Sequence, residues 1–332
     1  MKADTIDQIT LTKKKNKGIP SNTLQQVLAF SSLVVLVIFF SFASSSFMQW
    51  SNIVGILLST AVIGILALGA TFVIITGGID LSVGTVMTLS SVITGIIIVN
   101  SDLPIIVGVV GGILTGALCG LLCGLAITKL KIPPFVATLA MMMIAKGLAL
   151  VISKAAPIYF TDKPMFTKIA LGSIIPGISI PNAVIIFFVL GIIAAIILSK
   201  TILGRFNLAI GSNEDATKLS GVNVDYWKMT IYTLAGAFTG IAGVLMASRL
   251  NSAQPALGQG YELEAIAAVV IGGTSLSGGK GTIIGTIIGA LIMSVLTNGL
   301  RVLSIPQEWQ TVVVGFVIIL AVYMDILRRG KG

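Results

Sequence analysis

Apolar segments of about twenty residues, separated by short polar links, recur along almost the whole chain. The first run extends from about Val27 to Phe47. Further candidates start near residues 53, 81, 104, 135, 182, 228, 262, 281 and 308. A hydrocarbon core about 30 Å thick is crossed by about 20 residues of helix. The pattern therefore predicts an all-α fold, a polytopic membrane protein with about ten transmembrane helices.

Composition agrees with a membrane protein. Of 332 residues, 55% are hydrophobic and only 10% are charged, whereas a soluble domain has about 25% charged residues. The polar start followed by the first apolar run imitates a secretory signal, with Ala43 and Ser44 resembling a cleavage site. The run is too long for a signal core and more spans follow, so we expect an uncleaved first helix. We predict a cytoplasmic tail at 1–26, a membrane domain at 27–327 and a second cytoplasmic tail at 328–332.

Lysine and arginine are distributed unequally between the predicted loops. With both termini in the cytoplasm, fifteen of the 21 fall inside, in segments 1–26, 129–131, 200–228, 280 and 328–331. Five fall outside, and Lys146 lies within a helix. Such an excess marks the cytoplasmic side of a membrane. The net charge of +9 is thereby explained without a nucleic-acid partner, and membrane lipid is the expected surrounding.

The longest polar segment with helical character, 204–228, separates two strongly apolar halves of the chain. Ser212–Asn213 offers an N-cap for a short helix. Glu214–Asp215 then occupies the first turn, at the positive end of the helix dipole. Gly221 is placed to end the helix, and Asp225 is expected to cap the next one. A short helix in water beside a membrane has little core of its own, so we expect it to dock on a partner; a solvated loop is the alternative.

Glycine recurs at every fourth position in several predicted helices, which lets helix backbones approach closely inside lipid. Two glycine-rich interruptions also resemble each other, 77–84 and 272–279. Paired interruptions in corresponding places are typical of duplicated transporter architectures with a pathway near the breaks. We therefore predict pathway positions at Gly77, Gly78, Gly272 and Gly273. The alternative is a pair of tight turns built from the same residue types.

One lysine, Lys146, falls midway along a helix that starts near Phe135. A charge at that depth costs about 2.5–3.5 kcal/mol on insertion scales, so it is expected to face a water-filled path or a partner. Asp80 and Glu264 are the candidate partners by depth, and Asp80 is favoured because it lies in a backbone break. We predict that all three residues belong to a translocation pathway. Snorkelling of the long lysine stem is the alternative.

Metal and nucleotide sites are not predicted. The chain has no His and two Cys, Cys119 and Cys123, so no further His or Cys is available to complete a zinc site. The run Gly279–Gly281 superficially resembles a phosphate-binding loop, but its spacing and the residue after Lys280 do not fit. No cofactor is expected, and the chain carries no ATP-binding motif of its own.

Longer motifs carry a resemblance to a known family. The run ASRLNSAQPALGQGYELEAIAAVVIGGTSL at 247–276, together with 77–84 and 213–221, resembles the ribose-type permease subunits of bacterial ABC importers, and the similarity covers nearly the whole chain. The resemblance implies a ten-helix fold similar to the vitamin B12 importer type, in the bacterial inner membrane. It also implies a monosaccharide substrate and three partners: a second permease subunit, expected as a homodimer, a cytoplasmic ATP-binding subunit, and an extracytoplasmic sugar-binding protein.

The resemblance implies a function for the short polar helix predicted within 204–228. Its motif is similar to the family's coupling motif, which sits in a cleft of the ATPase, with Glu214, Asp215, Ala216, Leu219 and Gly221 as the contact or its frame. The common form is Glu-Ala-Ala, three residues, then Gly; here Asp stands in place of the first Ala and the glycine falls one residue late. The implied mechanism is alternating access driven by a separate ATPase. This chain is then a translocation subunit rather than an enzyme.

Two other transporter classes remain open from the residues alone. An ion-coupled secondary transporter would use Asp80 as a proton or sodium site, as intramembrane carboxylates often are. A gated pore is the third class. The polar helix around Glu214 has no evident task in either of them, which favours the ATP-driven importer.

The long link 154–181 contains several prolines and lies outside in the predicted topology. Compact domains rarely contain a structureless link of that length without a function. We expect Asp162 and Lys163 to contribute to a docking surface for the sugar-binding protein, with Asn251 and Gln254 beside them. A plug or a simple spacer is the alternative.

Overall fold

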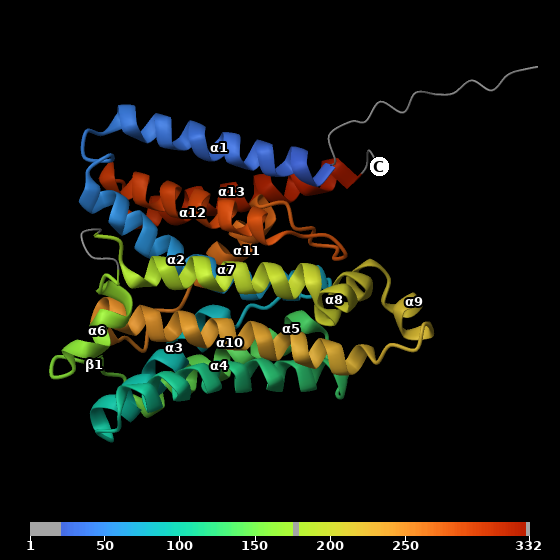
Figure 1. The fold of residues 1–332 in the computed structure, drawn as a ribbon, viewed down its shortest axis with the longest axis horizontal. Coiled ribbons are helices and arrows are strands. Elements are labelled where there is room, and N and C mark those ends of the chain that lie inside the picture. Colours follow the sequence, from blue (N-terminus) through green and yellow to red (C-terminus); the bar gives the residue numbers. More distant parts are fainter. Residues whose placement is uncertain (1–20, 175–178, 330–332) are drawn as a thin grey trace, which may run out of the picture.

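The computed structural model describes residues 21–174 and 179–329, which form a bundle of helices (Figure 1). The predicted all-α, polytopic architecture is confirmed. In this part of the chain the sheet consists of β1 (Ile158–Tyr159) paired antiparallel with β2 (Ser252–Ala253). The helices are α1 (Ser21–Ala43), α2 (Trp50–Ile75), α3 (Val83–Gly95) with the π-helical turn η1 (Ile96–Asn100), α4 (Ile105–Thr128), α5 (Pro134–Ile152), α6 (Pro164–Leu171), α7 (Asn182–Lys200), α8 (Ile202–Ser212), α9 (Glu214–Leu219), α10 (Val224–Leu250), α11 (Tyr261–Ile271), α12 (Ile283–Val302) and α13 (Gln307–Arg329).

Each of the ten predicted spans corresponds to a helix, but fewer are long enough to cross a membrane. Among the described residues, eight helices are sufficiently long and apolar. Helix α13 has a shorter apolar part, Gln307–Tyr323. Helix α11 has only 11 residues, or roughly 16 Å at 1.5 Å per residue. A full span at α11 is therefore wrong: the apolar run continues past Ile271, but Gly272 and Gly273, the latter with φ +92°, end the helix.

Burial separates central helices from peripheral ones. Within the most apolar window of each helix, 67% of residues are buried in α2 and in α10, but only 11% in α1. Helix α1 lies against α12, where Phe40 fills the space above Gly299 and belongs to a small apolar cluster separate from the main core. The outer side of α1 carries Phe42, which is 89% exposed. An apolar surface of this kind is expected for a helix that faces lipid.

Helices α4 and α10 pack backbone against backbone, and the glycines at every fourth position explain why. A Cβ added at Gly116 would overlap the carbonyl oxygen of Gly236 and lie 2.6 Å from the amide nitrogen of Gly240. A Cβ at Gly120 would overlap the carbonyl oxygen of Tyr232. Since lipid provides no hydrophobic drive for helix association, this close contact supplies the dispersion energy that holds the pair together.

The two glycine-rich breaks lie against each other. The first connects α2 to α3, and the second connects α11 to α12. The amide of Gly279 donates a hydrogen bond to the carbonyl of Ile75 at 2.9 Å. The backbone of Ser277 lies near Gly77, whose φ of +79° is in the left-handed region that favours glycine. The sequence similarity of the breaks thus corresponds to neighbouring positions at one end of the bundle.

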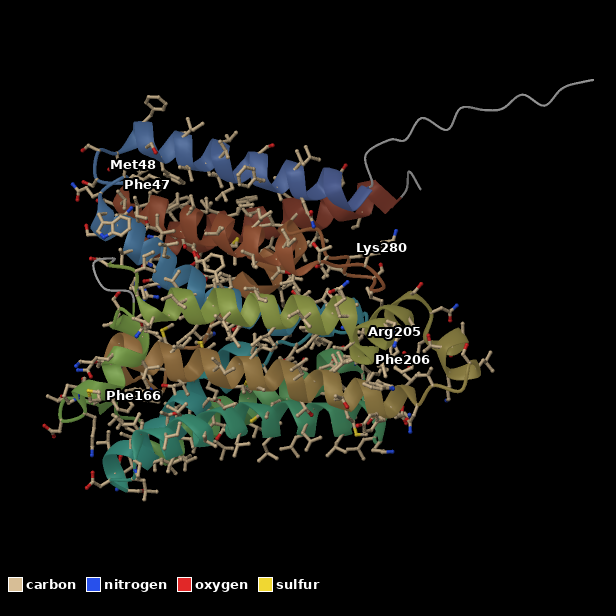
Figure 2. All side chains as sticks on the ribbon, in the orientation of Figure 1. Phe47, Met48, Phe166, Arg205, Phe206 and Lys280 are labelled. Atoms are coloured by element: carbon tan, nitrogen blue, oxygen red, sulfur yellow. The ribbon has the colours of Figure 1, made fainter. Side chains whose placement is uncertain are left out.

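The polar helices α8 and α9 project from that end of the bundle, where α1 begins and α13 ends (Figure 1). Arg205, Phe206 and Lys280 lie at this end, whereas Phe47, Met48 and Phe166 lie at or near the other (Figure 2). Residues 1–20 and 330–332, which include most of both predicted tails, lie outside the described part of the chain. The domain limits and the orientation across the membrane stay predictions.

Candidate functional site

Helix α9 is short, and its two ends are fixed by local contacts. The side chain of Asn213 accepts a hydrogen bond from the amide of Ala216 at 2.9 Å, which is one of the two predicted N-caps. Two carboxylates, Glu214 and Asp215, occupy the first turn. Beyond the last turn, Gly221 has φ +84°, a conformation that is unfavourable for residues with a Cβ. The predicted capped helix is therefore confirmed.

The outward side of α9 is an exposed apolar and acidic surface. Glu214 pairs with Lys228 at 2.6 Å, which ties α9 to the first turns of α10. Asp215 and Ala216 are exposed, and only Thr217 of this helix is buried. Leu219 is 89% exposed. A leucine side chain in water at the tip of a rigid, capped helix provides an apolar contact for another molecule.

The predicted cap of the following helix is wrong by two residues. Asn223, not Asp225, caps α10, because its side chain accepts a hydrogen bond from the amide of Tyr226 at 3.0 Å. An N-cap side chain bonds the amide two or three residues later, and both residues are of a suitable type. The choice is decided by α10 beginning at Val224. Asp225 lies in the first turn and pairs with Lys131 at 3.2 Å.

Asp80 is buried, with only 5% of its surface exposed. Its carboxylate accepts hydrogen bonds from the amide of Ser82 at 2.8 Å and from the Ser82 hydroxyl at 2.6 Å. Cys119 and Cys123 of α4 and Tyr232 of α10 lie near this carboxylate. The bonds to Ser82 fix the turn that leads into α3.

Lys146 has a different partner from the predicted one. Its ammonium donates to the side-chain oxygen of Gln259 at 3.4 Å. Three ion pairs form among residues 21–174 and 179–329, and none of them joins Lys146 to Asp80. The pairing with Asp80 is therefore wrong. The reason is tertiary: the segment before α11 places Gln259 beside α5, while Asp80 is held on the α4–α10 side of α3.

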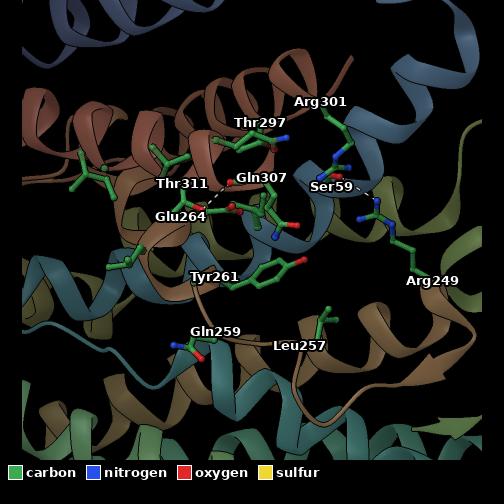
Figure 3. Close-up of a pocket in the computed structure, with 17 residues that line it drawn as sticks. Ser59, Arg249, Leu257, Gln259, Tyr261, Glu264, Thr297, Arg301, Gln307 and Thr311 are labelled. Atoms are coloured by element: carbon green, nitrogen blue, oxygen red, sulfur yellow. Dashed lines mark hydrogen bonds between the residues drawn. The ribbon is translucent and has the colours of Figure 1, made fainter. Parts of the chain in front are cut away.

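A polar cavity of about 470 Å³ opens between α2, α10, α11, α12 and α13 (Figure 3). Its volume falls within the range of small-molecule sites, roughly 300–1,000 Å³. The polar side chains that line it are Ser59, Arg249, Gln259, Tyr261, Glu264, Thr297, Arg301, Gln307, Gln310 and Thr311. Of the residues predicted for the pathway, Glu264 lines this cavity directly.

Some of these polar groups are fixed by hydrogen bonds and others make none. The guanidinium of Arg249 donates to the Ser59 hydroxyl at 3.2 Å, as Figure 3 shows. The hydroxyl of Tyr261, the carboxylate of Glu264 and the guanidinium of Arg301 make no hydrogen bond or ion pair within the described part of the chain. These three groups are available to bond a ligand or water.

Gln259 connects the cavity to Lys146. It lines the 470 Å³ cavity and also a small recess formed with Thr85, Thr88 and Lys146. Lys146 and Glu264 therefore line two separate spaces that share Gln259. Asp80 does not line either space.

The predicted pathway glycines have a different position. Gly77, Gly78, Gly272 and Gly273 line neither the cavity nor the recess. They belong to the paired breaks, which lie beside α8: a Cβ at Gly211 would overlap the carbonyl oxygen of Ile75. The structure thus separates the glycine breaks from the polar cavity.

The long link lies beside the segment after α10, as expected. Strand β1 within the link pairs with β2, with Ile158 opposite Ala253. Asp162 is exposed. The large side chains of Tyr159 and Met165 are also exposed, with 60% and 61% of their surface accessible. Residues 175–178 of this link lie outside the described part of the chain.

Other predicted docking residues are tied into the fold. Lys163 donates a hydrogen bond to Asp102, and its ammonium holds the pKa of that carboxyl below its ordinary value. Asn251 is half-buried with φ +52° at the end of α10. Gln254 is half-buried and donates to the Ser252 hydroxyl at 2.9 Å. Asn251 and Gln254 therefore frame this face rather than project from it.

Both cysteines are buried and free. They lie on the face of α4 that packs on the core, which agrees with their interpretation as small hydrophobic residues. No cluster of three or more His, Cys, Asp or Glu that would suit a metal ion occurs among the described residues.

A family model described as "Branched-chain amino acid transport system / permease component" matches residues 52–322. The match covers most of the chain. The chain belongs to this permease family. It is accordingly a membrane permease component of a transport system, and the expectation of a translocation subunit rather than an enzyme is confirmed.

Individual relatives of the permease share its length as well as its sequence. It is 47% identical over 307 residues to a ribose import permease protein of Bacillus subtilis strain 168, covering 91% of this chain and 93% of the relative. It is 40% identical over 297 residues to a ribose import permease protein of Escherichia coli K12, covering 89% and 91%. A xylose transport system permease protein of Haemophilus influenzae is 32% identical over 371 residues, covering 94% and 99%. No solved structure matches the permease, so its likeness to the vitamin B12 importer type stays a prediction.

Sequence reasoning missed most of the cavity of this permease. Arg249, Gln259, Tyr261, Arg301 and Gln307 line it, and none of them is assigned to a site from the sequence alone. The available signal was that polar links near 251–260 and 301–307 interrupt the last four apolar segments. Nothing in the linear pattern indicates that both links border one space.

Proposed function

We propose that this permease is the membrane subunit of an ATP-driven, binding-protein-dependent importer for a monosaccharide. The relatives named as ribose and xylose permeases support a sugar substrate. We place it in the bacterial inner membrane with both termini in the cytoplasm, which follows from the excess of Lys and Arg in the segments on that side.

The single observation that carries the ATP-driven mechanism is α9. Leu219, 89% exposed, stands at the tip of a helix that is capped at one end by Asn213 and ended by Gly221. We assign α9 as the contact with a separate ATPase subunit, with Glu214, Asp215 and Ala216 in the contact or its frame. Burying a leucine is worth about 1.5–3 kcal/mol, enough for one such side chain to matter in docking.

In the proposed cycle, ATP binding closes the ATPase dimer and displaces α9. Helix α8, which directly precedes α9 in the chain, contacts both glycine breaks, because Gly211 packs on Ile75 and Gly279. The breaks then pass the displacement to α2, α3, α11 and α12. The pathway glycines of the breaks act as joints in this proposal, and Lys146 and Glu264 line the path. Asp80 positions the start of α3.

The proposed assembly contains a second copy of the permease and an extracytoplasmic sugar-binding protein. We assign the receptor to the end of the bundle opposite α9. The receptor finds apolar and charged contacts there in the exposed side chains of Tyr159, Asp162 and Met165. The conformation of that surface is stabilised by Lys163, Asn251 and Gln254.

Reconstitution tests this function. The permease is placed in proteoliposomes with its ATPase subunit and sugar-binding protein, and uptake of labelled D-ribose, D-xylose and D-allose is followed. We expect uptake of at least one sugar that requires ATP, the ATPase subunit and the receptor, and that vanadate abolishes. Uptake by the permease alone, driven by a sodium or proton gradient, would establish the ion-coupled alternative instead.

A further inference from the structure

We propose that the 470 Å³ cavity between α2 and α10–α13 is a transit site that binds one neutral monosaccharide inside the permease. Tyr261, Glu264 and Arg301 are its contacting groups. This inference rests on the proposed function, because it names a place along the path at which the sugar pauses between receptor and cytoplasm.

The contacting groups come from two helix ends that face one space. Tyr261 and Glu264 lie in the first turn of α11, three residues apart and therefore on the same side of the helix. Arg301 lies in the last turn of α12. Figure 3 shows the Tyr261 ring and the Glu264 carboxyl group projecting into the cavity, with Arg301 and Arg249 near Ser59.

The bonding capacity of these groups suits a polyhydroxyl ligand. In the described part of the chain, the carboxylate of Glu264, the guanidinium of Arg301 and the hydroxyl of Tyr261 make no hydrogen bond, although the three groups interact electrostatically with one another. Sugar hydroxyls both donate and accept, so one ring can donate to the carboxylate and accept from the guanidinium. Tyr261 and Glu264 are half-buried, and half-buried polar groups without hydrogen bonds are costly, which favours occupancy. The ring of Tyr261 adds an apolar face for sugar C–H groups.

The cavity presents both signs of charge, the carboxylate of Glu264 and the guanidinium groups of Arg249 and Arg301. The bond from Arg249 to Ser59 at 3.2 Å fixes one of these charges in place. A neutral sugar can bond to groups of either sign, because each of its hydroxyls both donates and accepts.

Uptake by the complete reconstituted complex provides the first test. We compare Glu264→Gln, Arg301→Gln and Tyr261→Phe with Glu308→Gln, an exposed change in the first turn of α13 outside the cavity. Losing one bond to a charged group is expected to lower sugar uptake roughly tenfold or more for the first two variants. Receptor-stimulated ATP hydrolysis is expected to persist, because α9 is unchanged. Glu308→Gln is expected to match the wild type.

Protection from chemical labelling tests occupancy directly. Thr311→Cys places a thiol in the cavity, and Glu308→Cys places one outside it. We measure maleimide labelling of each in the complex with D-ribose, D-xylose, D-allose or ribose 5-phosphate. A neutral sugar is expected to slow labelling of Thr311→Cys severalfold and to leave Glu308→Cys unchanged. Adding Glu264→Gln is expected to remove this protection, and ribose 5-phosphate reports whether the cavity also accepts an anionic sugar.

The outcomes separate this inference from the proposed function. ATP-dependent sugar uptake that is undiminished in all three cavity variants, or labelling that none of the neutral sugars slows, overturns the transit site and leaves the importer intact. Absence of ATP-dependent uptake in the wild-type complex overturns the proposed function. The labelling result then still reports whether the cavity binds a sugar.

Discussion

Gly279 donates its amide hydrogen to the carbonyl of Ile75 at 2.9 Å, and this bond joins the end of α2 to the break before α12. Gly211 of α8 packs into the same place, where an added Cβ would overlap the Ile75 oxygen and lie 2.5 Å from the Gly279 nitrogen. Three chain segments far apart in sequence therefore meet without intervening side chains. A displacement of α8 is transmitted to both breaks at once.

The first prediction concerns this three-segment contact. Gly211→Ala adds a methyl where backbone atoms leave no room, and overpacking of this kind costs about 1–3 kcal/mol. We expect receptor-stimulated ATP hydrolysis and sugar uptake to fall together, while the ATPase subunit still binds through α9. Gly55→Ala, whose added Cβ has no atom within 4 Å, is the matched control. Normal uptake by Gly211→Ala would exclude this route for coupling.

The second prediction concerns the tip of α9. Leu219→Asp is expected to weaken binding of the ATPase subunit at least about tenfold, since burying a leucine is worth about 1.5–3 kcal/mol. Co-purification and a titration of ATPase activity measure it. Leu130→Asp is the control, because Leu130 is 69% exposed in the link between α4 and α5.

A paired variant strengthens the test of α9. Gly221→Val places a β-branched residue at φ +84°, where a Cβ is strained, and Glu214→Lys removes the ion pair with Lys228. We expect the double variant to insert into the membrane but to lose coupling. Full coupling in this variant would be incompatible with the assigned role of α9.

The third prediction concerns the α4–α10 pair. Gly116→Ala directs a methyl into the backbone of Gly236 and Gly240, and we expect a loss of about 1–3 kcal/mol of stability. Thermal unfolding in detergent, followed by size-exclusion chromatography, measures the change. Gly111→Ala on the same helix meets only the flexible end of Ile97 and is expected to have a small effect. Equal effects of the two changes would show that the backbone contact contributes nothing.

The fourth prediction separates Asp80 from Lys146. Asp80→Ala leaves the buried amide and hydroxyl of Ser82 without their acceptor, so we expect about 1–3 kcal/mol of destabilisation. Lys146→Met is expected to lower uptake with little change in the melting temperature. The double variant is expected to be additive in stability within about 0.5 kcal/mol. A larger coupling energy would mean that the two side chains interact in the membrane.

Features set by neighbouring residues were predictable from the sequence. The cap at Asn213, the acidic first turn and the glycine stop at Gly221 depend on contacts within a few residues, so the pattern of residue types was sufficient. The apolar runs placed the helices for the same reason, and the glycine spacing anticipated the close approach of α4 and α10. Each of these features is a local property of the chain.

Features that depend on how distant segments meet were not predictable. The length of α11 depends on where Gly260 and Gly272 bend the chain, although the apolar run continues beyond it. Lys146 was paired with Asp80 by depth alone, whereas the path of the segment before α11 brings Gln259 to it. The cavity requires Arg249 and Arg301, 52 positions apart in the chain, to converge, and no linear pattern reports that convergence.

The peripheral position of α1 bears on how the protein is made. Its anchor is Phe40 against Gly299, a contact that no earlier helix can replace. At roughly 5–20 residues per second, the ribosome completes the intervening stretch of about 260 residues in on the order of 13–50 s. During that interval the contacts available to α1 within its own cluster are those of Phe40 with Phe47 and with Ile56 of α2. The nearly uninterrupted apolar surface of α1 is compatible with lipid contact during this interval. The first helix to be inserted is therefore among the last to complete its packing.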